Sequence, residues 1–392
     1  MALQNTLKIG ITCYPSVGGS GIVASSLGEE LADRGHEVHF ISYEHPFRLP
    51  VHAPRIHFHP VRINDYGLFR YPDYTLPLSV KMAEVSCQYR LDVLHVHYAV
   101  PHATAAILAG SMLPSKRRPR VVTTLHGTDT TLLGGDPGYG PAIRHALIHS
   151  DAVTTVSVFL QQETKRMLGV ERPIEVVYNF FKPKMPLRSR EQVRGDLGVD
   201  SEVLILHSSN LRSPKRIDLL LAALARIRPS DSFKLLVLAG SSFAPFTAEV
   251  SRLGLEDRVI VREKVIDMEE YLQAADLGLF TSETESFCLS ILELMFFACP
   301  SVATRVGGIP EVIEDHVSGW LVPFGDVDGL AHTVEQLIQN PIRRGTLGQA
   351  AQQRAREKFS ADCIVPRYEE LYQRVCRSPR KRKQAFPISY PC

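Results

Sequence analysis

The chain has 392 residues, which fits two domains of about 100–200 residues each, and its 44% hydrophobic and 22% charged content is ordinary for a soluble globular protein. A formal net charge of only +2 gives no reason to expect nucleic acid as a partner. No apolar run approaches the roughly 20 residues that cross a bilayer, and no basic region with a long apolar run opens the chain, so we expect neither a signal peptide nor stable membrane association.

Seven cysteines are scattered through the chain, and none of them forms a C-x-x-C pair. Because an odd number of cysteines argues against a disulfide framework, we expect reduced thiols and a cytoplasmic protein. The sequence carries no signal for or against self-association, so homo-oligomerisation stays open.

Strand and helix signals alternate through the first half of the chain. A strand over 7–12, a glycine turn over 18–21, a helix over 22–34 and a strand over 38–42 predict a Rossmann-type unit. The glycines, with Gly19 among them, fit a loose G-x-G-x-x-A pattern but begin several residues after the strand. A dinucleotide site, an approach of backbone N–H groups to another anion, and a plain turn therefore all stay open.

Polar residues follow the later strands of this half, which we expect at 92–97, 120–125, 151–156 and 174–177. They are His97, Tyr98, Thr124, His126, Thr128 and Asp129, with Arg144 on a following helix. Tyr98, Thr124 and Arg144 offer the hydroxyls and the guanidinium that a small carboxylate substrate needs. His95 and His97 share a strand face, but no clear third ligand accompanies them, so we expect polar strand ends and no metal site.

Residues 181–200 interrupt the alternation with a basic, proline-bearing stretch. This stretch predicts a link between a first domain over 1–180 and a second over 201–362, with the last helix, about 363–377, a candidate to return to the first domain. The basic residues of 378–392 suit a disordered solubilising tail better than contact with nucleic acid or membrane. The fold class we expect is α/β, with two Rossmann-like, doubly wound parallel-sheet domains facing across a cleft.

Three cations, Arg212, Lys215 and Arg216, lie in the loop between a strand over 203–208 and the next helix. Two cations at such a loop can neutralise a diphosphate leaving group as charge develops on it. A solvated charged turn is the alternative, and a phosphate cradle further along the same sheet weighs against it.

That cradle is predicted where the stretch from Glu285 to Glu293 follows a short buried strand and opens an apolar helix. Ligands bind at the carboxyl ends of parallel strands, and the backbone N–H groups of 287–289 at the positive helix end suit a diphosphate. Glu285 would reach sugar hydroxyls, and Glu293, two turns along, a nucleotide ribose. A helix-entry charge and an exposed helix residue are the plain alternative, but a second strand–glycine–helix turn at Gly307 favours a cradle.

These residues carry a resemblance to a known family. Glu285-x7-Glu293, Lys215 and the run Gly307-Gly308-Ile309-Pro310-Glu311 resemble the signature of retaining GT-B glycosyltransferases of family 4. The resemblance extends from about residue 8 to about 374. Four stretches of the first half, 10–15, 18–21, 95–102 and 123–129, are similar to the branch that transfers GlcNAc to L-malate in the first step of bacillithiol synthesis.

The resemblance implies UDP-GlcNAc as donor, L-malate as acceptor and no metal. It assigns donor binding to Gly19, Ser20, Asn210, Arg212, Lys215, Glu285, Phe287, Cys288, Leu289 and Glu293. It assigns acceptor binding to Tyr98, Thr124, Thr128 and Arg144. Lys215, Glu285 and His126 are the catalytic candidates, with His126 near the transferred sugar.

The implied reaction retains the anomeric configuration, with the acceptor hydroxyl attacking on the face that the diphosphate leaves. Lys215 would supply the positive charge that a metal supplies in other transferases, and domain closure would complete the site. Two residues depart from the family pattern, since Asn210 stands where many relatives carry Arg and Cys288 where most carry Gly. Another acceptor, such as an inositol phosphate or a lipid, and a sugar-nucleotide-binding regulator without turnover are the alternatives.

Overall fold

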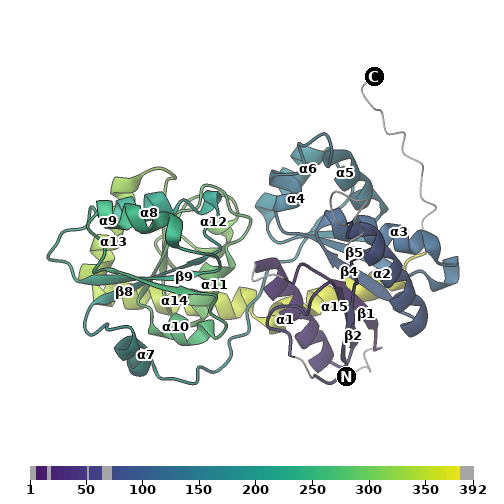
Figure 1. Ribbon diagram of the computed structural model, residues 1–392, viewed down its shortest axis with the longest axis horizontal. Coiled ribbons are helices and arrows are strands. Elements are labelled where there is room, and N and C mark those ends of the chain that lie inside the picture. The colour runs from purple at the N-terminus through teal and green to yellow at the C-terminus, as the bar shows by residue number, and fades with distance from the viewer. Residues whose placement is uncertain (1–5, 16–18, 51–52, 64–72, 380–392) are drawn as a thin grey trace. The chain divides into compact units, whose positions relative to one another are not determined.

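The computed structural model describes residues 6–15, 19–50, 53–63 and 73–379. The chain forms two compact units, Met1–Tyr178 with Ile364–Cys392 and Asn179–Cys363, here called unit 1 and unit 2 and described separately (Figure 1). Both units are α/β, as the sequence predicts. Within the described ranges, no helix is both long enough and apolar enough to cross a membrane.

The sheet of unit 1 is entirely parallel, with the strand order β3-β2-β1-β4-β5-β6-β7. Its register places Ile9 of β1 opposite Val38 of β2 and Val93 of β4. The strands are β1 (Lys8–Thr12), β2 (Glu37–Ser42), β3 (Ile56–Pro60), β4 (Val93–His97), β5 (Arg120–Leu125), β6 (Ala152–Thr155) and β7 (Glu175–Val176). The order reverses between β1 and β4, so the crevice for a ligand is expected at the carboxyl ends of these two strands.

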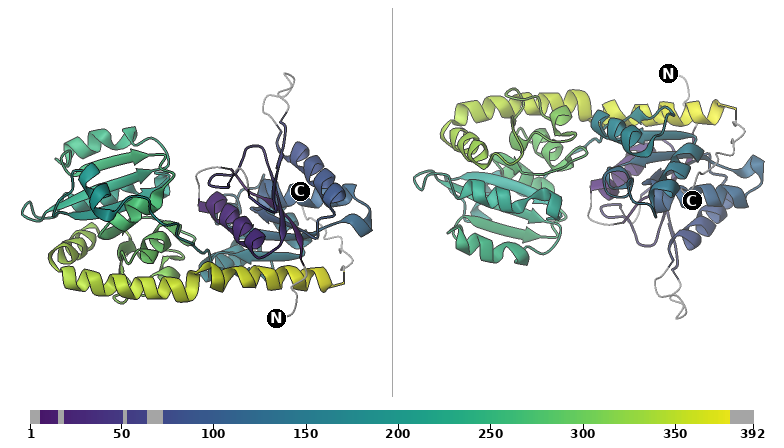
Figure 2. Two further views of the ribbon diagram at one scale, coloured as in Figure 1. Left: turned by 90° about the horizontal axis from the view of Figure 1, so that it is seen from below. Right: turned by 90° about the horizontal axis from the view of Figure 1, so that it is seen from above.

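In the described part of unit 1, six helices lie between these strands, and a seventh joins them from the last described segment of the chain. They are α1 (Gly19–Asp33), α2 (Thr75–Tyr89), α3 (Thr104–Met112), α4 (Thr128–Thr131), α5 (Gly140–His149), α6 (Val158–Leu168) and α15 (Ala361–Arg377), with short turns η1 (Ala99–Ala103) and η2 (Ser115–Arg117). Helix α15 packs against the sheet of unit 1 (Figure 2), where the Tyr372 hydroxyl is 2.6 Å from Nδ1 of His95. Its buried apolar residues at 364, 365, 368, 371 and 372 form one face, which explains why the last helix returns to this unit.

Unit 2 repeats the same plan with the parallel order β10-β9-β8-β11-β12-β13. The strands are β8 (Val203–Ser209), β9 (Phe233–Ala239), β10 (Val259–Glu263), β11 (Leu277–Phe280), β12 (Ser301–Thr304) and β13 (Trp320–Val322). The helices are α7 (Arg190–Asp196), α8 (Ile217–Leu224), α9 (Thr247–Arg252), α10 (Met268–Ala274), α11 (Leu289–Phe296), α12 (Ile309–Val312), α13 (Val327–Gln339) and α14 (Pro341–Phe359), with turns η3 (Ser213–Lys215) and η4 (Ala244–Phe246).

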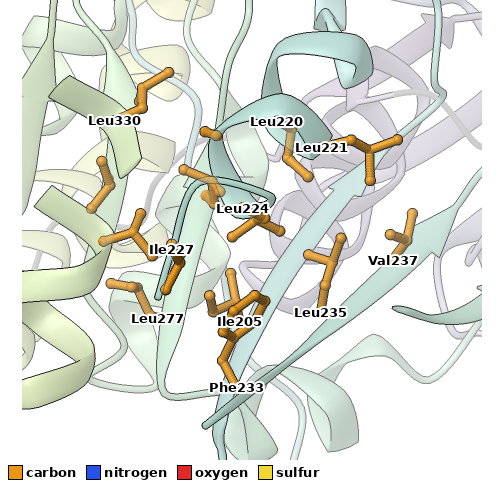
Figure 3. Packing of buried hydrophobic residues seen from close by; sticks show 14 of the residues in the cluster. Ile205, Leu220, Leu221, Leu224, Ile227, Phe233, Leu235, Val237, Leu277 and Leu330 are labelled. Carbon is orange, nitrogen blue, oxygen red and sulfur yellow. The ribbon is translucent and has the colours of Figure 1, made fainter. Parts of the chain in front are cut away.

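The core of unit 2 lies between α8 and the sheet. Leu220, Leu221 and Leu224 on α8 pack over Ile205 of β8 and Leu235 of β9, and all five side chains are at most 1% exposed (Figure 3). Burial of such side chains on both faces explains why the strands read as continuous apolar runs. The core therefore fixes β8, whose carboxyl end carries the cationic loop.

Two boundaries differ from the expectation. Helix α1 begins at Gly19, so Gly19 and Ser20 belong to its first turn and not to a preceding loop. Residues 181–200 include α7, which a capping box at Ser189 starts and whose Arg190 and Arg194 bond Asp276. The connection between the units is therefore shorter than the sequence suggests. Most of the basic tail lies outside the described residues, from 380 on, and the cleft stays a prediction.

Candidate active site

The best-defined part of the site is an ion pair at the carboxyl edge of the unit 2 sheet. Strand order reverses between β8 and β11, and the loops that leave these two strands carry Lys215 and Glu285. The Lys215 ammonium donates to the Glu285 carboxylate, and the two side chains are 23% and 15% exposed. Of the three donors of the ammonium, this contact uses one, so two are left for an anionic ligand.

Two further hydrogen bonds join the loops, and both are accepted by backbone carbonyls of the Lys215 loop. The Thr281 hydroxyl lies 3.1 Å from the Lys215 carbonyl, to which it donates, and the Glu283 N–H donates to the Pro214 carbonyl at 2.8 Å. Burial lowers the pKa of Lys215, but the Glu285 charge and hydrogen bond outweigh that effect, so the pKa is raised overall. Lys215 is therefore a fixed cation at neutral pH.

The glycine turn after β12 supports Glu285. Gly308 donates its N–H to the Glu285 carbonyl at 2.9 Å, and a Cβ on Gly307 would lie 1.9 Å from that same oxygen. Gly307 also has a φ of +54°, a conformation that side chains disfavour. The turn thus positions the backbone of Glu285, a role that differs from the second phosphate cradle suggested by the sequence.

Helix α11 begins beside this pair at Leu289, and the residue that caps its start, Cys288, has a φ of 69°. Residues other than glycine rarely adopt this left-handed conformation, so Cys288 is held there at a conformational cost. The side chains of Phe287 and Cys288 are buried, Leu289 is half-buried, and the Ser290 hydroxyl donates to the Ser208 carbonyl of β8 at 3.0 Å. Burial and the Glu285 charge raise the pKa of the Cys288 thiol to about 12, so it stays neutral.

Glu293 is only 2% exposed on α11, so it is not the exposed helix residue of the plain alternative. Its charge acts on the Cys288 thiol together with that of Glu285, which places both carboxylates around the start of the helix. A buried carboxylate about one turn into a helix at a ligand edge suits a hydroxyl-bearing partner such as a ribose.

The cationic loop is shaped by residues that the sequence analysis did not single out. His207, buried in β8, lies 2.9 Å from the Leu279 carbonyl through Nδ1 and 2.8 Å from the Ser209 hydroxyl through Nε2. The Ser209 oxygen accepts the N–H of Leu211, which has a φ of 54°. Burial lowers the pKa of His207 to about 4, so its neutral ring can accept the Ser209 proton. In the sequence, the signal for this network is His207 itself, a polar residue within the apolar run of the predicted strand.

Asn210 and the two neighbouring arginines take different positions in this loop. The Asn210 side-chain oxygen accepts the N–H of Arg212 at 3.3 Å, so it shapes the turn. Arg212 is exposed, and within the described ranges its guanidinium makes no hydrogen bond or ion pair. Arg216 is instead held by Asp218 at 2.7 Å. Arg212 and Lys215 therefore stay the predicted cations for a diphosphate.

In unit 1 the structure brings Ser20, Tyr98 and His126 together. The Tyr98 hydroxyl is 3.0 Å from the Ser20 hydroxyl, and the rings of Tyr98 and His126 are 5.4 Å apart. Tyr98 has a φ of 88°, held in part by its N–H donating to the Thr124 carbonyl at 2.9 Å. Gly19 is exposed at the start of α1, where an added Cβ would have nothing within 4 Å.

Thr124 requires a correction. Its side chain is fully buried, with the hydroxyl 2.7 Å from Nε2 of His95 and 2.7 Å from the Thr154 hydroxyl. Tyr368 of α15 also hydrogen-bonds to it. These three partners use the capacity of one hydroxyl, so Thr124 does not face a ligand. It supports Tyr98 through its carbonyl, because β5 lies inside the sheet and both its faces are covered.

The other two acceptor candidates are not joined to Tyr98 by any hydrogen bond or ion pair among the described residues. Thr128 is half-buried as the first residue of α4. Arg144 is exposed on α5, with a guanidinium nitrogen 3.8 Å from where a Cβ on Gly169 would lie. In the described part of the chain this guanidinium makes no hydrogen bond or ion pair, so it remains available to a carboxylate.

A cluster of histidines lies behind Tyr98. Nδ1 of His97 is 2.8 Å from Nε2 of His126, and His102 contacts the His97 carbonyl through Nδ1. Burial lowers the pKa of His95 and His126 to about 3 and that of His102 to about 4, and it holds the pKa of His97 well below its ordinary range. His126 is therefore a neutral hydrogen-bonding group near pH 7 and not a proton donor in cationic form.

The two halves of the chain match two family descriptions. Residues 17–184 match Glycosyltransferase Family 4, and residues 189–354 match Glycosyl transferases group 1. The chain belongs to these glycosyltransferases, and its two parallel sheets are the domains of the GT-B fold. It is 43% identical over 380 residues to N-acetyl-alpha-D-glucosaminyl L-malate synthase of Bacillus anthracis, covering 96% of this chain and 99% of the relative.

Other similarities are more distant. A D-inositol 3-phosphate glycosyltransferase of Saccharomonospora viridis is 32% identical over 200 residues, which cover 46% of each chain. The solved structure of Anabaena Alr3699/HepE in complex with UDP-glucose has a TM-score of 0.78 at 21% identity, covering 94% of this chain and 100% of that one. At this identity the likeness supports the fold alone.

Replacing Gly307 with Ala should displace Glu285, because the new Cβ would overlap the Glu285 carbonyl. We expect kcat/KM for the sugar-nucleotide donor to fall at least about tenfold, since small misplacements of a reacting group are costly. The matched control is Gly254→Ala, where φ is +65° but nothing lies within 4 Å of the added Cβ. Equal losses in the two variants would mean that backbone strain, and not contact with Glu285, is responsible.

Replacing His95 with Gln should weaken the pH dependence of unfolding. The folded pKa is about 3 and the ordinary value about 6.5, so the unfolded chain binds more protons between these values. The free energy of unfolding therefore falls as pH drops through this window, by up to about 1.4 kcal/mol per pH unit for one group.

Urea unfolding of both proteins from about pH 8 to about pH 5 measures this slope. At about pH 8 the imidazole is neutral in both states, so any difference there reports lost packing and hydrogen bonds alone. An identical slope in the variant would contradict the assigned burial of a neutral His95.

Proposed function

We propose that the protein transfers N-acetylglucosamine from UDP-GlcNAc to the hydroxyl of L-malate with retention of configuration, as the first step of bacillithiol synthesis. The observation that carries the proposal is the 43% identity to the malate synthase over nearly the full length of both chains. Both halves contribute to that match, so it includes the residues assigned to donor and acceptor alike. A reducing, cytoplasmic setting is part of the proposal and agrees with the free cysteines in the described ranges.

The donor is assigned to unit 2. The backbone N–H groups at the start of α11, with Arg212 and Lys215, would hold the diphosphate. Glu285 would accept hydrogen bonds from the sugar hydroxyls, and Glu293 from the ribose. As the bond from the anomeric carbon to the phosphate oxygen breaks, negative charge develops on UDP, and Lys215 stabilises it.

The acceptor is assigned to unit 1. Arg144 would pair with a malate carboxylate, while Tyr98 and Thr128 offer hydroxyls. Gly19 and Ser20 at the start of α1 would approach the donor, and neutral His126 offers a hydrogen bond beside the transferred sugar. The malate hydroxyl forms the new bond to the anomeric carbon, and its proton goes to the departing phosphate oxygen. No protein nucleophile is needed, so the chain contributes positioning and charge stabilisation. We propose that this step uses no metal, because Lys215 carries the charge.

The direct test is to incubate the protein with UDP-GlcNAc, with and without L-malate, and to follow UDP release and the mass of the product. Malate-dependent UDP and a GlcNAc–malate conjugate are expected. Parallel reactions with inositol phosphate test the acceptor suggested by the partial match to the inositol phosphate enzyme. UDP release only with inositol phosphate would replace the acceptor, and donor binding without any turnover would favour a regulator.

Replacing Lys215 with Ala should lower kcat by about 10²-fold or more, as the loss of one transition-state contact does. The control is Lys234→Ala. Lys234 is a lysine near the amino end of β9, away from the proposed site, and its ammonium donates to the Asp257 carbonyl. Because Lys215→Ala leaves Glu285 without its cation, melting temperatures should accompany the kinetics. Near-normal turnover in a folded Lys215→Ala protein would remove Lys215 from the diphosphate site.

Replacing Arg144 with Ala should raise the KM for malate about tenfold or more and change the KM for UDP-GlcNAc little, because a charged hydrogen bond to one substrate is lost. Lys165→Ala is the matched control, since Lys165 is an exposed cation on the neighbouring helix α6. Equal effects on the two KM values would assign Arg144 to something other than the acceptor.

A further inference from the structure

A second cluster of histidines lies in unit 1, away from the residues assigned to transfer. His39 of β2 and His57 of β3 are register partners, and Glu37 and His59 lie two residues along on the same face of these strands. The rings of His57 and His59 stack on His39, with centroids 4.7 and 5.2 Å away. The Tyr89 ring packs against all three imidazoles, with centroids 4.5 to 6.3 Å away. Packing accounts for the stacked rings, but it does not require a carboxylate to face them.

Three of these groups converge on one point. Oε1 of Glu37 is 3.6 Å from Nε2 of His39 and 3.5 Å from Nε2 of His57. Each of the three residues offers a ligand atom that lies within 4.8 Å of those of the other two. Ligand atoms at about 2.0–2.1 Å from a tetrahedral zinc ion stand about 3.3–3.4 Å apart. The distances from Oε1 of Glu37 to the two imidazole nitrogens are therefore only slightly longer than those in an occupied zinc site.

The buried ligand has an unused nitrogen. His39 is fully buried, and its Nε2 has no hydrogen-bond partner among the described residues, although it faces Glu37 and His57. Its other nitrogen, Nδ1, is 3.0 Å from Nε2 of His59. When Nδ1–H donates to His59, the lone pair of His39 lies on Nε2, which is how neighbouring groups orient metal-binding histidines.

The carboxylate is oriented as well. Oε2 of Glu37 lies 3.2 Å from the Lys8 ammonium, which leaves Oε1 to face the two imidazoles. Glu37 and His57 are partly exposed, with side-chain exposures of 29% and 44%, so an ion can enter from solvent and keep a water molecule as its fourth ligand. The nearby Lys8 charge moderates the affinity without removing a ligand atom.

We propose that Glu37, His39 and His57 bind one zinc ion, with a water molecule completing the tetrahedron and His59 orienting His39. Glu37 is the first residue of β2, so the site lies at the amino edge of the sheet, whereas Tyr98 and His126 follow the carboxyl ends of their strands. The ion is therefore not part of the transfer reaction. It joins edge strand β3 to β2 and stabilises unit 1 by binding only the folded form.

The test uses the full-length protein without a histidine tag, stripped of metal with a chelator. Zinc titration against a competing indicator gives affinity and stoichiometry, and melting temperature with and without zinc gives an independent readout. We expect one ion per chain and a higher melting temperature with zinc. His57→Gln removes the most exposed ligand, so the variant should fold normally. Its affinity for zinc should fall at least about tenfold, because changes to groups that only support a metal ligand already cost about that much.

The control is His149→Gln. His145 and His149 stack at 3.9 Å, one turn apart on α5, and form a rival imidazole pair in the same unit. This variant should keep wild-type affinity and the zinc-dependent rise in melting temperature. Equal binding by wild type and His57→Gln, or loss of binding in His149→Gln, would overturn the proposal. Cobalt substitution adds a check, because thiolate charge-transfer bands would place the metal at a cysteine and also overturn it.

Discussion

The ion pair between Lys215 and Glu285 is the interaction on which the proposed donor site depends. Two largely buried charges are costly to desolvate, and removing either one leaves the other uncompensated. Hydrogen bonds from Thr281 and Glu283 to the backbone of the Lys215 turn hold the two loops together, which helps to offset this desolvation cost. The pair is therefore formed before any ligand binds, so a diphosphate at this edge would meet an ammonium that is already held in position.

Unit 1 supports its residues in a different way, with neutral polar groups in place of a charge pair. Thr124 lies at the centre, bonded to His95 and Thr154, and Tyr372 of α15 bonds the far nitrogen of His95. Each group has a partner that suits its neutral form, so the network can be buried without an unpaired charge. The last helix of the chain thus helps to fix the strand that carries Tyr98, although 277 positions separate Tyr372 from His95.

The two departures from the family pattern have local structural meaning. At Cys288 the backbone adopts a left-handed conformation that glycine accepts most easily, so the cysteine is held there at some conformational cost. Its thiol is buried and neutral, which makes it an element of packing beside the carboxylates. Asn210 uses its side chain to bond the N–H of Arg212, and the arginine remains exposed beside Lys215. A shorter residue at one position therefore helps to orient the cation two positions later.

The sequence by itself determined the architecture and the chemical class. Alternating strands and helices predicted both parallel sheets, because that pattern is local and depends on strand order alone. The resemblance carried by Glu285, Glu293 and Lys215 implied the glycosyltransferase class, and the donor site at these strand ends stays a proposal. Tertiary structure decided which groups face a ligand. It buried the Thr124 hydroxyl, turned Gly307 into a support for Glu285, and brought His39 and His57 together with Glu37. Such contacts depend on how distant segments pack, and periodicity along one segment carries no information about which neighbour will cover it.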